Sequence, residues 1–181
     1  MPYKGPLAWL VLGLGCWLCI PILLKTEKSF YEKKESRFSS PIISPSKILR
    51  LRSDGYGKGY FGAPRNGGRR HLGIDLATPI GQYIFASKSG RVIRASIDPG
   101  FGLYVELAHP DGLATYYAHL SHISTHEGDW VVQGQLIGLS GKTGNAKSRK
   151  ISPHLHFEIR NKTKALNPLF GWMDPSLQFT Y

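Results

Sequence analysis

Residues 103–118, LYVELAHPDGLATYYA, decide the fold class of this chain. Two runs rich in β-branched and aromatic residues, 103–107 and 114–118, lie on either side of Asp111-Gly112. Such runs favour strands, and an Asp-Gly pair between them favours a tight turn. We therefore expect this stretch to form two neighbouring antiparallel strands.

The same pattern continues on both sides of this stretch. Short apolar runs, separated by turn dipeptides such as Ser89-Gly90, Pro99-Gly100 and Gly128-Asp129, occupy residues 82–86, 91–95, 130–132 and 136–139. The 21 glycines and 12 prolines among 181 residues favour strands joined by turns over a helical bundle. No stretch after residue 47 sustains helical periodicity over three turns. The prediction is an all-β, antiparallel, β-sandwich-like domain over residues 47–181.

The amino-terminal region has a different composition. Residues 6–24 carry no charge, and a helix of that length spans about 30 Å of hydrocarbon. The exit at Leu23-Leu24-Lys25 lacks the small residues of a cleavage site, so we predict an uncleaved transmembrane helix within an anchor over residues 1–24. Residues 25–46 are rich in Lys, Glu, Ser and Pro, which is typical of a flexible tether.

The charge of the chain narrows the classes of partner. The formal net charge of +11 suits a polyanion such as nucleic acid, anionic lipid or an anionic cell wall. The 41% of apolar residues is too high for a disordered chain. Both cysteines, Cys16 and Cys19, lie inside the apolar run, so a metal site in the domain must use histidines and carboxylates.

Two histidine motifs have the spacing of metal ligands. His71 and Asp75 are four residues apart, and His154 and His156 are two apart. On a strand an even separation places both side chains on one face, so two such strands side by side could bring three ligands to one metal. A helix for the first pair is disfavoured by Gly73 and the nearby Pro79. Imidazole nitrogens with one carboxylate oxygen suit Zn²⁺ and leave a fourth position for water.

These motifs, with a third around His119, resemble those of the lysostaphin-type zinc metallopeptidases, which cut peptide cross-links of bacterial peptidoglycan. The three matching segments are His71–Asp75, Tyr117–Leu120 and His154–Glu158. The resemblance runs from about Gly55 to Phe170. Three motifs in the right order and spacing are specific, whereas any one of them alone is weak.

The resemblance implies a role for each of five residues. His71, Asp75 and His156 would hold zinc, and His119 and His154 would act on water and substrate. Zinc lowers the pKa of bound water from 15.7 to about 7, so hydroxide forms at neutral pH. A neutral imidazole beside it can take a proton from water and return it to the leaving amine.

Two further residues, Tyr117 and Glu158, have two interpretations each. Tyr117 could donate a hydrogen bond to the oxyanion or could be an ordinary packed tyrosine of a strand. Glu158 could bond a ligand imidazole or be an ordinary strand residue. The tract 142–150 is longer than the family's usual link before the metal strand, so it bears on the shape of the groove. Surface positions are expected for the three remaining histidines, His109, His122 and His126.

The function predicted from the sequence is a zinc-dependent endopeptidase acting on peptidoglycan cross-links, either D,D-links between stem peptides or glycine bridges. The alternative is a catalytically inactive relative that binds cell wall or activates another hydrolase. A surface for single-stranded nucleic acid would explain the charge but not the histidine spacing. We expect a bacterial envelope protein held in the inner membrane by residues 6–24, with its domain outside the cytoplasm or released by cleavage. The lysines and arginine after residue 24, counted alone, favour the opposite orientation.

Overall fold

The computed structural model describes residues 30–31, 34–162 and 164–181. The predicted anchor, residues 1–24, lies outside them. The described residues contain no helix long and apolar enough to cross a membrane. The chain divides into two units, 1–36 and 37–181, and the second contains all the numbered strands.

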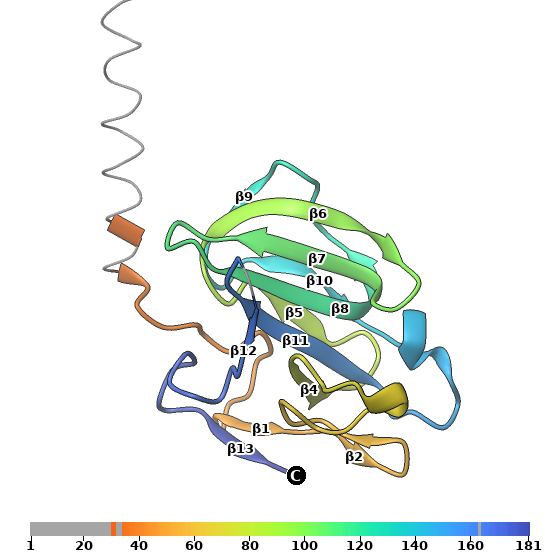
Figure 1. Cartoon of the computed structure of the whole chain (residues 1–181). Helices are drawn as coiled ribbons and strands as arrows, with labels where there is room; N and C mark the ends of the chain where they lie inside the picture. Colours follow the sequence, from red (N-terminus) through yellow and green to blue (C-terminus); the bar gives the residue numbers. More distant parts are fainter. Residues whose placement is uncertain (1–29, 32–33, 163) are drawn as a thin grey trace, which may run out of the picture. The chain divides into compact units, whose positions relative to one another are not determined.

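One antiparallel sheet organises the second unit (Figure 1). Its main path runs β12 (Ala165–Leu166), β11 (His154–Arg160), β8 (Ala114–Ile123), β7 (Gly102–Ala108), β6 (Gly90–Asp98) and β9 (Trp130–Val131). Three further strands join it: β4 (Ile74–Ala77) pairs with β11, and β10 (Leu136–Ser140) pairs with β8 and β5 (Tyr83–Phe85). The predicted pair at 103–118 is β7 and β8, in which Leu107 lies opposite Thr115. The prediction of an all-β antiparallel fold is confirmed for the described part of this unit, where the helical segments are the 3₁₀ turns η1 (Asn66–Gly68) and η2 (Gly144–Lys147).

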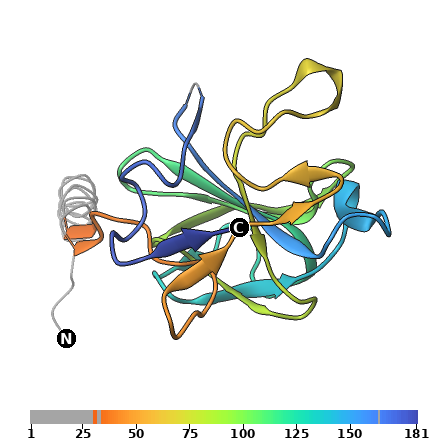
Figure 2. The same ribbon diagram turned by 90° about the horizontal axis from the view of Figure 1, so that it is seen from below.

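Two small sheets complete the unit. β2 (Ser53–Asp54) and β3 (Gly57–Lys58) form a short hairpin. β1 (Ile48–Arg50) and β13 (Gln178–Thr180) lie side by side and are parallel, as Figure 2 shows. An isolated bridge between Leu51 and Leu76 connects the segment after β1 to β4. The start of the unit is thereby attached to the strand that carries Asp75.

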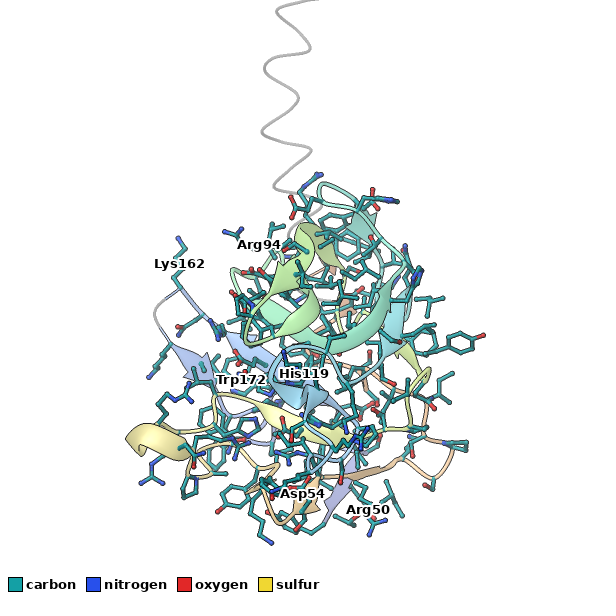
Figure 3. All side chains as sticks on the ribbon, turned by 90° about the vertical axis from the view of Figure 1, so that its right-hand side faces the viewer. Arg50, Asp54, Arg94, His119, Lys162 and Trp172 are labelled. Carbon is teal, nitrogen blue, oxygen red and sulfur yellow. The ribbon has the colours of Figure 1, made fainter. Side chains whose placement is uncertain are left out.

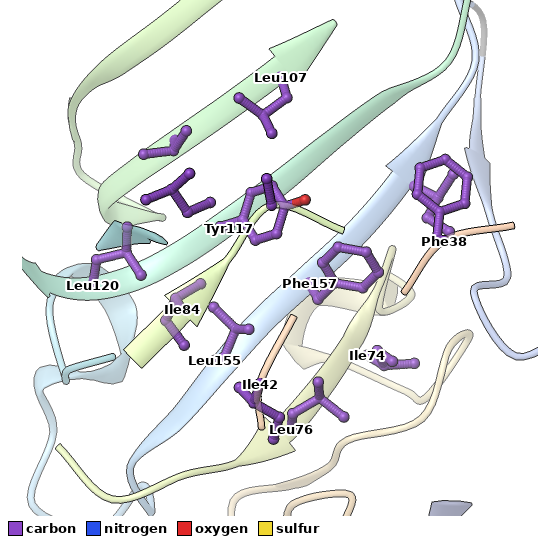
Figure 4. Packing of buried hydrophobic residues seen from close by; sticks show 14 of the residues in the cluster. Phe38, Ile42, Ile74, Leu76, Ile84, Leu107, Tyr117, Leu120, Leu155 and Phe157 are labelled. Atoms are coloured by element: carbon purple, nitrogen blue, oxygen red, sulfur yellow. The ribbon is translucent and has the colours of Figure 1, made fainter. Parts of the chain in front are cut away.

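The core lies on one face of β11. Leu155, Phe157 and Ile159 are fully buried there and pack with Tyr117 and other apolar side chains (Figure 4). Full burial of an aliphatic or aromatic side chain contributes about 1.5–3 kcal/mol. A slip of one residue in the register of β11 would exchange its two faces, so this apolar set fixes where the opposite face points.

The tether predicted over residues 25–46 differs from the structure after Ser36. Phe38 is 1% exposed and belongs to the core together with Ile42. The backbone of Phe38 donates to Trp172 O, and its carbonyl accepts from Asp174 N. The compact unit therefore begins at Arg37, ten residues before the predicted boundary. Because the segment is mostly polar, its composition does not reveal that two of its apolar residues, Phe38 and Ile42, lie in the core.

Candidate metal centre and active site

The three predicted metal ligands meet where β4 pairs with β11. The antiparallel register places Asp75 opposite His156, and Asp75 Oδ1 lies 2.8 Å from His156 Nδ1. His71 precedes β4, so the expectation that a strand would carry it is wrong. It reaches the same point from the loop, and its Nε2 lies 3.0 Å from His156 Nδ1 and 2.9 Å from Asp75 Oδ1. Gly73 makes this possible because a Cβ there would lie 2.3 Å from Phe157 O.

The outer nitrogens of both imidazoles are already bonded. His71 Nδ1 lies 2.9 Å from Tyr60 O, and His156 Nε2 lies 2.7 Å from Glu158 Oε1. A neutral ring that donates its N–H to this outer acceptor keeps a lone pair, on His71 Nε2 or His156 Nδ1, which is available to a metal. These two nitrogens and Asp75 Oδ1 are the candidate ligand atoms, and they lie within 4.8 Å of one another. Three buried electron-donating atoms at this separation fit a cation.

The charges around this point favour a positive ion. Burial opposes ionisation of Asp75, but hydrogen bonds from His156 and His71 outweigh it and hold the pKa of Asp75 well below its ordinary value. Burial likewise lowers the pKa of His156, yet Asp75 and Glu158 raise it to about 9. Glu158 thus bonds the imidazole of His156, a predicted metal ligand, which agrees with the first of its two predicted interpretations.

Two arginines orient the carboxylate of Asp75. Arg52 donates to Asp75 Oδ2 from Nη2 at 2.9 Å and from Nε at 3.2 Å, and Arg65 donates to it from Nη2 at 3.1 Å. Arg52 is itself held by Asp54, whose two oxygens each lie 2.8 Å from Nη1. Oδ1 is consequently the oxygen left to face the imidazoles. No motif in the sequence predicts the role of these two arginines.

His119 enters the site through an irregular backbone. It lies on β8 next to η2 and has a φ of 62°, which costs energy for a residue other than glycine (Figure 3). The register of β8 against β7 shifts between Leu103 and Val105, and the His119 amide donates to Phe101 O instead. The left-handed backbone turns the side chain toward His154, with the two ring centroids 4.9 Å apart. Regular alternation along the strand could not predict this position.

His119 and His154 are held in the same way. Their Nδ1 atoms lie 3.0 Å from Thr143 O and 2.7 Å from Ser152 O, so each Nδ1–H donates to a carbonyl and each Nε2 retains a lone pair. Burial and the neighbouring imidazoles lower the pKa of His119 to about 3. Burial lowers the pKa of His154 to about 4, although Asp75 opposes the shift. Both rings are therefore neutral at pH 7, with a lone pair on Nε2.

A cavity of about 520 Å³ gives access to the site. All five predicted residues line it, and its other lining residues include Arg65, Arg69, Arg70, Phe101, Asn145 and Ala146. Three of these are arginines on the loop before His71, and two belong to η2 in the tract 142–150. The long tract therefore forms part of the cavity wall, and its Thr143 carbonyl positions His119.

Residues 69–168 match the family described as peptidase family M23, and the match contains all five residues. The chain belongs to peptidase family M23. This confirms the predicted resemblance to the lysostaphin-type enzymes. M23 peptidases depend on zinc and include peptidoglycan endopeptidases.

Two relatives of this M23 chain have names that describe different kinds of protein. It is 48% identical over 104 residues to stage II sporulation protein Q of Bacillus subtilis, a match covering 56% of this chain and 36% of the relative. It is 39% identical over 99 residues to peptidoglycan DD-endopeptidase ShyA of Vibrio cholerae, covering 55% and 22%. The match therefore spans about a third or less of each relative's length.

Three solved structures share the fold of this chain. A zinc-containing peptidase from Vibrio cholerae aligns with a TM-score of 0.61 and 29% identity over 76% of this chain and 41% of that one. The SpoIIQ–SpoIIIAH pore-forming complex gives 0.59 and 34% over 76% and 91%. The catalytic domain of lysostaphin from Staphylococcus simulans gives 0.53 and 35% over 65% and 89%.

The donor set of this M23 chain fits zinc. Two imidazole nitrogens and one carboxylate oxygen are ligands that Zn²⁺ prefers, and three protein ligands leave a coordination position for water. His71, Asp75 and His156 would hold the ion. Their outer partners, the Tyr60 carbonyl and Glu158, are of the kind that orients zinc-bound histidines.

The oxyanion role predicted as one interpretation of Tyr117 is wrong. Tyr117 lies opposite Phe157, on the core side of the sheet, and is fully buried. Its hydroxyl accepts from Ser87 N at 2.8 Å and from Thr115 Oγ1 at 3.0 Å. Because the side chain points away from His156, the alternative of a packed strand tyrosine holds.

One of the three remaining histidines also differs from the prediction. His109, expected at the surface, is 6% exposed, and its Nδ1 and Nε2 lie 3.0 Å from Ser89 O and 2.9 Å from Thr115 Oγ1. It continues the buried hydrogen-bond chain that ends at Tyr117. His122 and His126 are exposed, as predicted.

Proposed function

We propose that this chain is a zinc-dependent endopeptidase that hydrolyses peptide cross-links of bacterial peptidoglycan. The observation that carries the proposal is the meeting of two imidazole nitrogens and one carboxylate oxygen beside two further neutral imidazoles. A purely structural zinc site would have no use for His119 and His154, which face the same cavity. Membership of M23 supports the same reaction class.

The residues divide the chemistry between them. Zinc, when bound by His71, Asp75 and His156, polarises a carbonyl and lowers the pKa of water. His119 and His154 accept the proton of the attacking water at Nε2 and return it to the leaving amine. Their Nδ1–H groups are fixed by carbonyls, so each ring is held in the tautomer that this role requires.

The second candidate is an inactive module that binds cell wall or another protein. The observation that favours it is the 48% identity to a sporulation protein together with the likeness to the SpoIIQ–SpoIIIAH complex. Against it, this chain keeps all five residues of the site within contact range of their partners. Loss of function would leave the left-handed conformation of His119 without a use.

One experiment separates the two candidates. The full chain, loaded with one zinc per molecule, is incubated with purified peptidoglycan, and the released fragments are identified by mass spectrometry. We expect soluble peptide fragments, no release after chelation and recovery on adding zinc. Binding to the wall without any release from several wall types would support the inactive module instead.

We also propose that the domain acts outside the cytoplasmic membrane of a bacterial cell, held there by residues 6–24 or released after cleavage. The reason is the substrate, because peptidoglycan lies on that side. Protease added to spheroplasts should degrade the domain. Protection of the domain until the membrane is lysed would place it on the cytoplasmic side.

A further inference from the structure

A second cavity lies beside the metal centre. Its volume is about 750 Å³, and its lining includes Leu72, Leu113, Tyr116 and Arg160. Leu72 lines the first cavity as well, so the two cavities adjoin at this half-exposed side chain. A peptide that lies over the metal centre can therefore extend across Leu72 into the second cavity.

Arg160 is the fixed cation of this cavity. Its guanidinium lies over the ring of Tyr116, with Cζ 4.3 Å from the centroid, and its Nε donates to Glu158 Oε2. Glu158 in turn is bonded to His156 through its other oxygen. The guanidinium is thus held in place on two sides, and among the described residues neither of its Nη atoms has a hydrogen-bond partner.

The acid nearest to Arg160 in this cavity is already paired. Glu106 accepts a hydrogen bond from the Tyr116 hydroxyl, and its other oxygen lies 3.5 Å from Arg94 Nε. Lys162 and Lys164, also in the lining, are exposed and add positive charge. The cavity consequently has a net positive lining with one ordered guanidinium.

We propose that the second cavity binds a free carboxylate of the peptide substrate, and that Arg160 is the residue that selects it. The chemistry is the match between a planar guanidinium with free Nη donors and a two-oxygen carboxylate. Lysines at the rim attract the anion but lack this geometry. The inference rests on the proposed function, since it names a feature of the substrate that the same site would cleave.

The position of Arg160 limits where that carboxylate lies. It is four residues beyond His156 on β11, which corresponds to about 13 Å between Cα atoms. An extended peptide covers this distance in about four residues. The selected carboxylate therefore belongs to a chain end or acidic side chain within about four residues of the cleaved bond.

Two matched probes test the proposal: acetyl-tetraglycine as the free acid and as the amide. Each is titrated into the isotope-labelled full chain, first stripped of metal and then loaded with zinc, and followed by NMR. We expect the acid to bind about tenfold more tightly than the amide, with the largest shifts at Tyr116 and Arg160. Equal affinity for acid and amide would overturn the proposal.

Substitutions assign the preference to Arg160. Arg160→Gln should bind acid and amide equally, and Arg160→Lys should keep its charge and Glu158 contact but only part of the preference. Arg50→Gln is the control, because it removes the same charge from an exposed residue that lines neither cavity. An unchanged preference in Arg160→Gln, or one lost equally in Arg50→Gln, would refute the role of Arg160.

The result of this test does not depend on whether the proposed function is correct. The metal-stripped chain cannot perform zinc-dependent hydrolysis, so its binding preference does not depend on activity. Release of wall fragments without any acid preference would disprove only the carboxylate site. An Arg160-dependent preference without release would leave the carboxylate site intact and favour the binding module.

Discussion

The two faces of β11 are stabilised by different physics. Leu155, Phe157 and Ile159 lie on one face, where close packing and the exclusion of water stabilise them. His154, His156 and Glu158 lie on the other face. They are also buried, but hydrogen bonds to particular atoms stabilise them. Burial on the apolar face tolerates substitutions of similar volume, whereas each loss on the polar face leaves a named partner unpaired.

The largest expected effect is on the polar face, at His156. His156→Ala removes one of the three proposed zinc ligands and leaves Asp75 and Glu158 without their shared partner. We expect zinc retention, measured by metal analysis after dialysis, to fall to background, and fragment release from peptidoglycan to cease. Stoichiometric zinc in this variant would show that another residue completes the site.

Substitution of His119 tests whether zinc binding and hydrolysis depend on different residues. It belongs to the same cavity but donates to Thr143 O, and in the described part of the chain it makes no hydrogen bond or ion pair with Asp75. His119→Ala should retain zinc at the level of the unsubstituted chain while hydrolysis falls about 10²- to 10⁴-fold, the range for loss of a general base. The same analysis applied to both histidine variants decides the matter, because equal zinc loss would reject this division of roles.

On the apolar face the expected effect is on stability. Phe157 is fully buried between His156 and Glu158 on β11 and packs on Tyr117 at 5.4 Å between centroids. Phe157→Ala should lower the free energy of unfolding by about 3–5 kcal/mol, and Phe157→Leu by much less. Urea titration measures both. A small loss in Phe157→Ala would mean that the core collapses around the missing ring.

The same contrast explains what the sequence could predict. Alternation in HLHFE and the runs at 103–107 and 114–118 locate strands correctly, because burial follows a period of two residues. His71, His119 and Arg52 depend instead on a loop, a left-handed residue and contacts with distant backbone, none of which has a period. The burial of Phe38 could not be predicted for a related reason, because two apolar residues in a polar segment are too few to form a pattern.

Arg52 tests how far the polar face extends from the metal. Its backbone amide donates to Asp75 O, and its side chain bonds Asp75 Oδ2. Arg52→Gln should weaken zinc binding about 10- to 100-fold, the usual effect of losing a residue that orients a ligand. Competition with a chromophoric chelator gives the affinity. Arg50→Gln, two residues earlier and exposed, is the matched control and should leave zinc affinity unchanged.

Asp54 is the outermost member of this polar network and has the smallest expected effect. Burial opposes its ionisation, but hydrogen bonds from Ser152 N and Arg52 outweigh it and lower the pKa of Asp54 to about 2. A carboxyl whose pKa is lower in the folded chain stabilises it above the unfolded value, near pH 4, and this stabilisation is lost as the pH falls toward 2. Because Asp54 is partly exposed, the loss should be about 1–2 kcal/mol.

Urea unfolding at pH 5 and at pH 2.5 should show this loss in the unsubstituted chain and less of it in Asp54→Asn. In the Arg52→Gln background the effect of Asp54→Asn should shrink, and an effect that stayed the same would show that Asp54 acts through Ser152 and not through the arginine that orients the metal ligand.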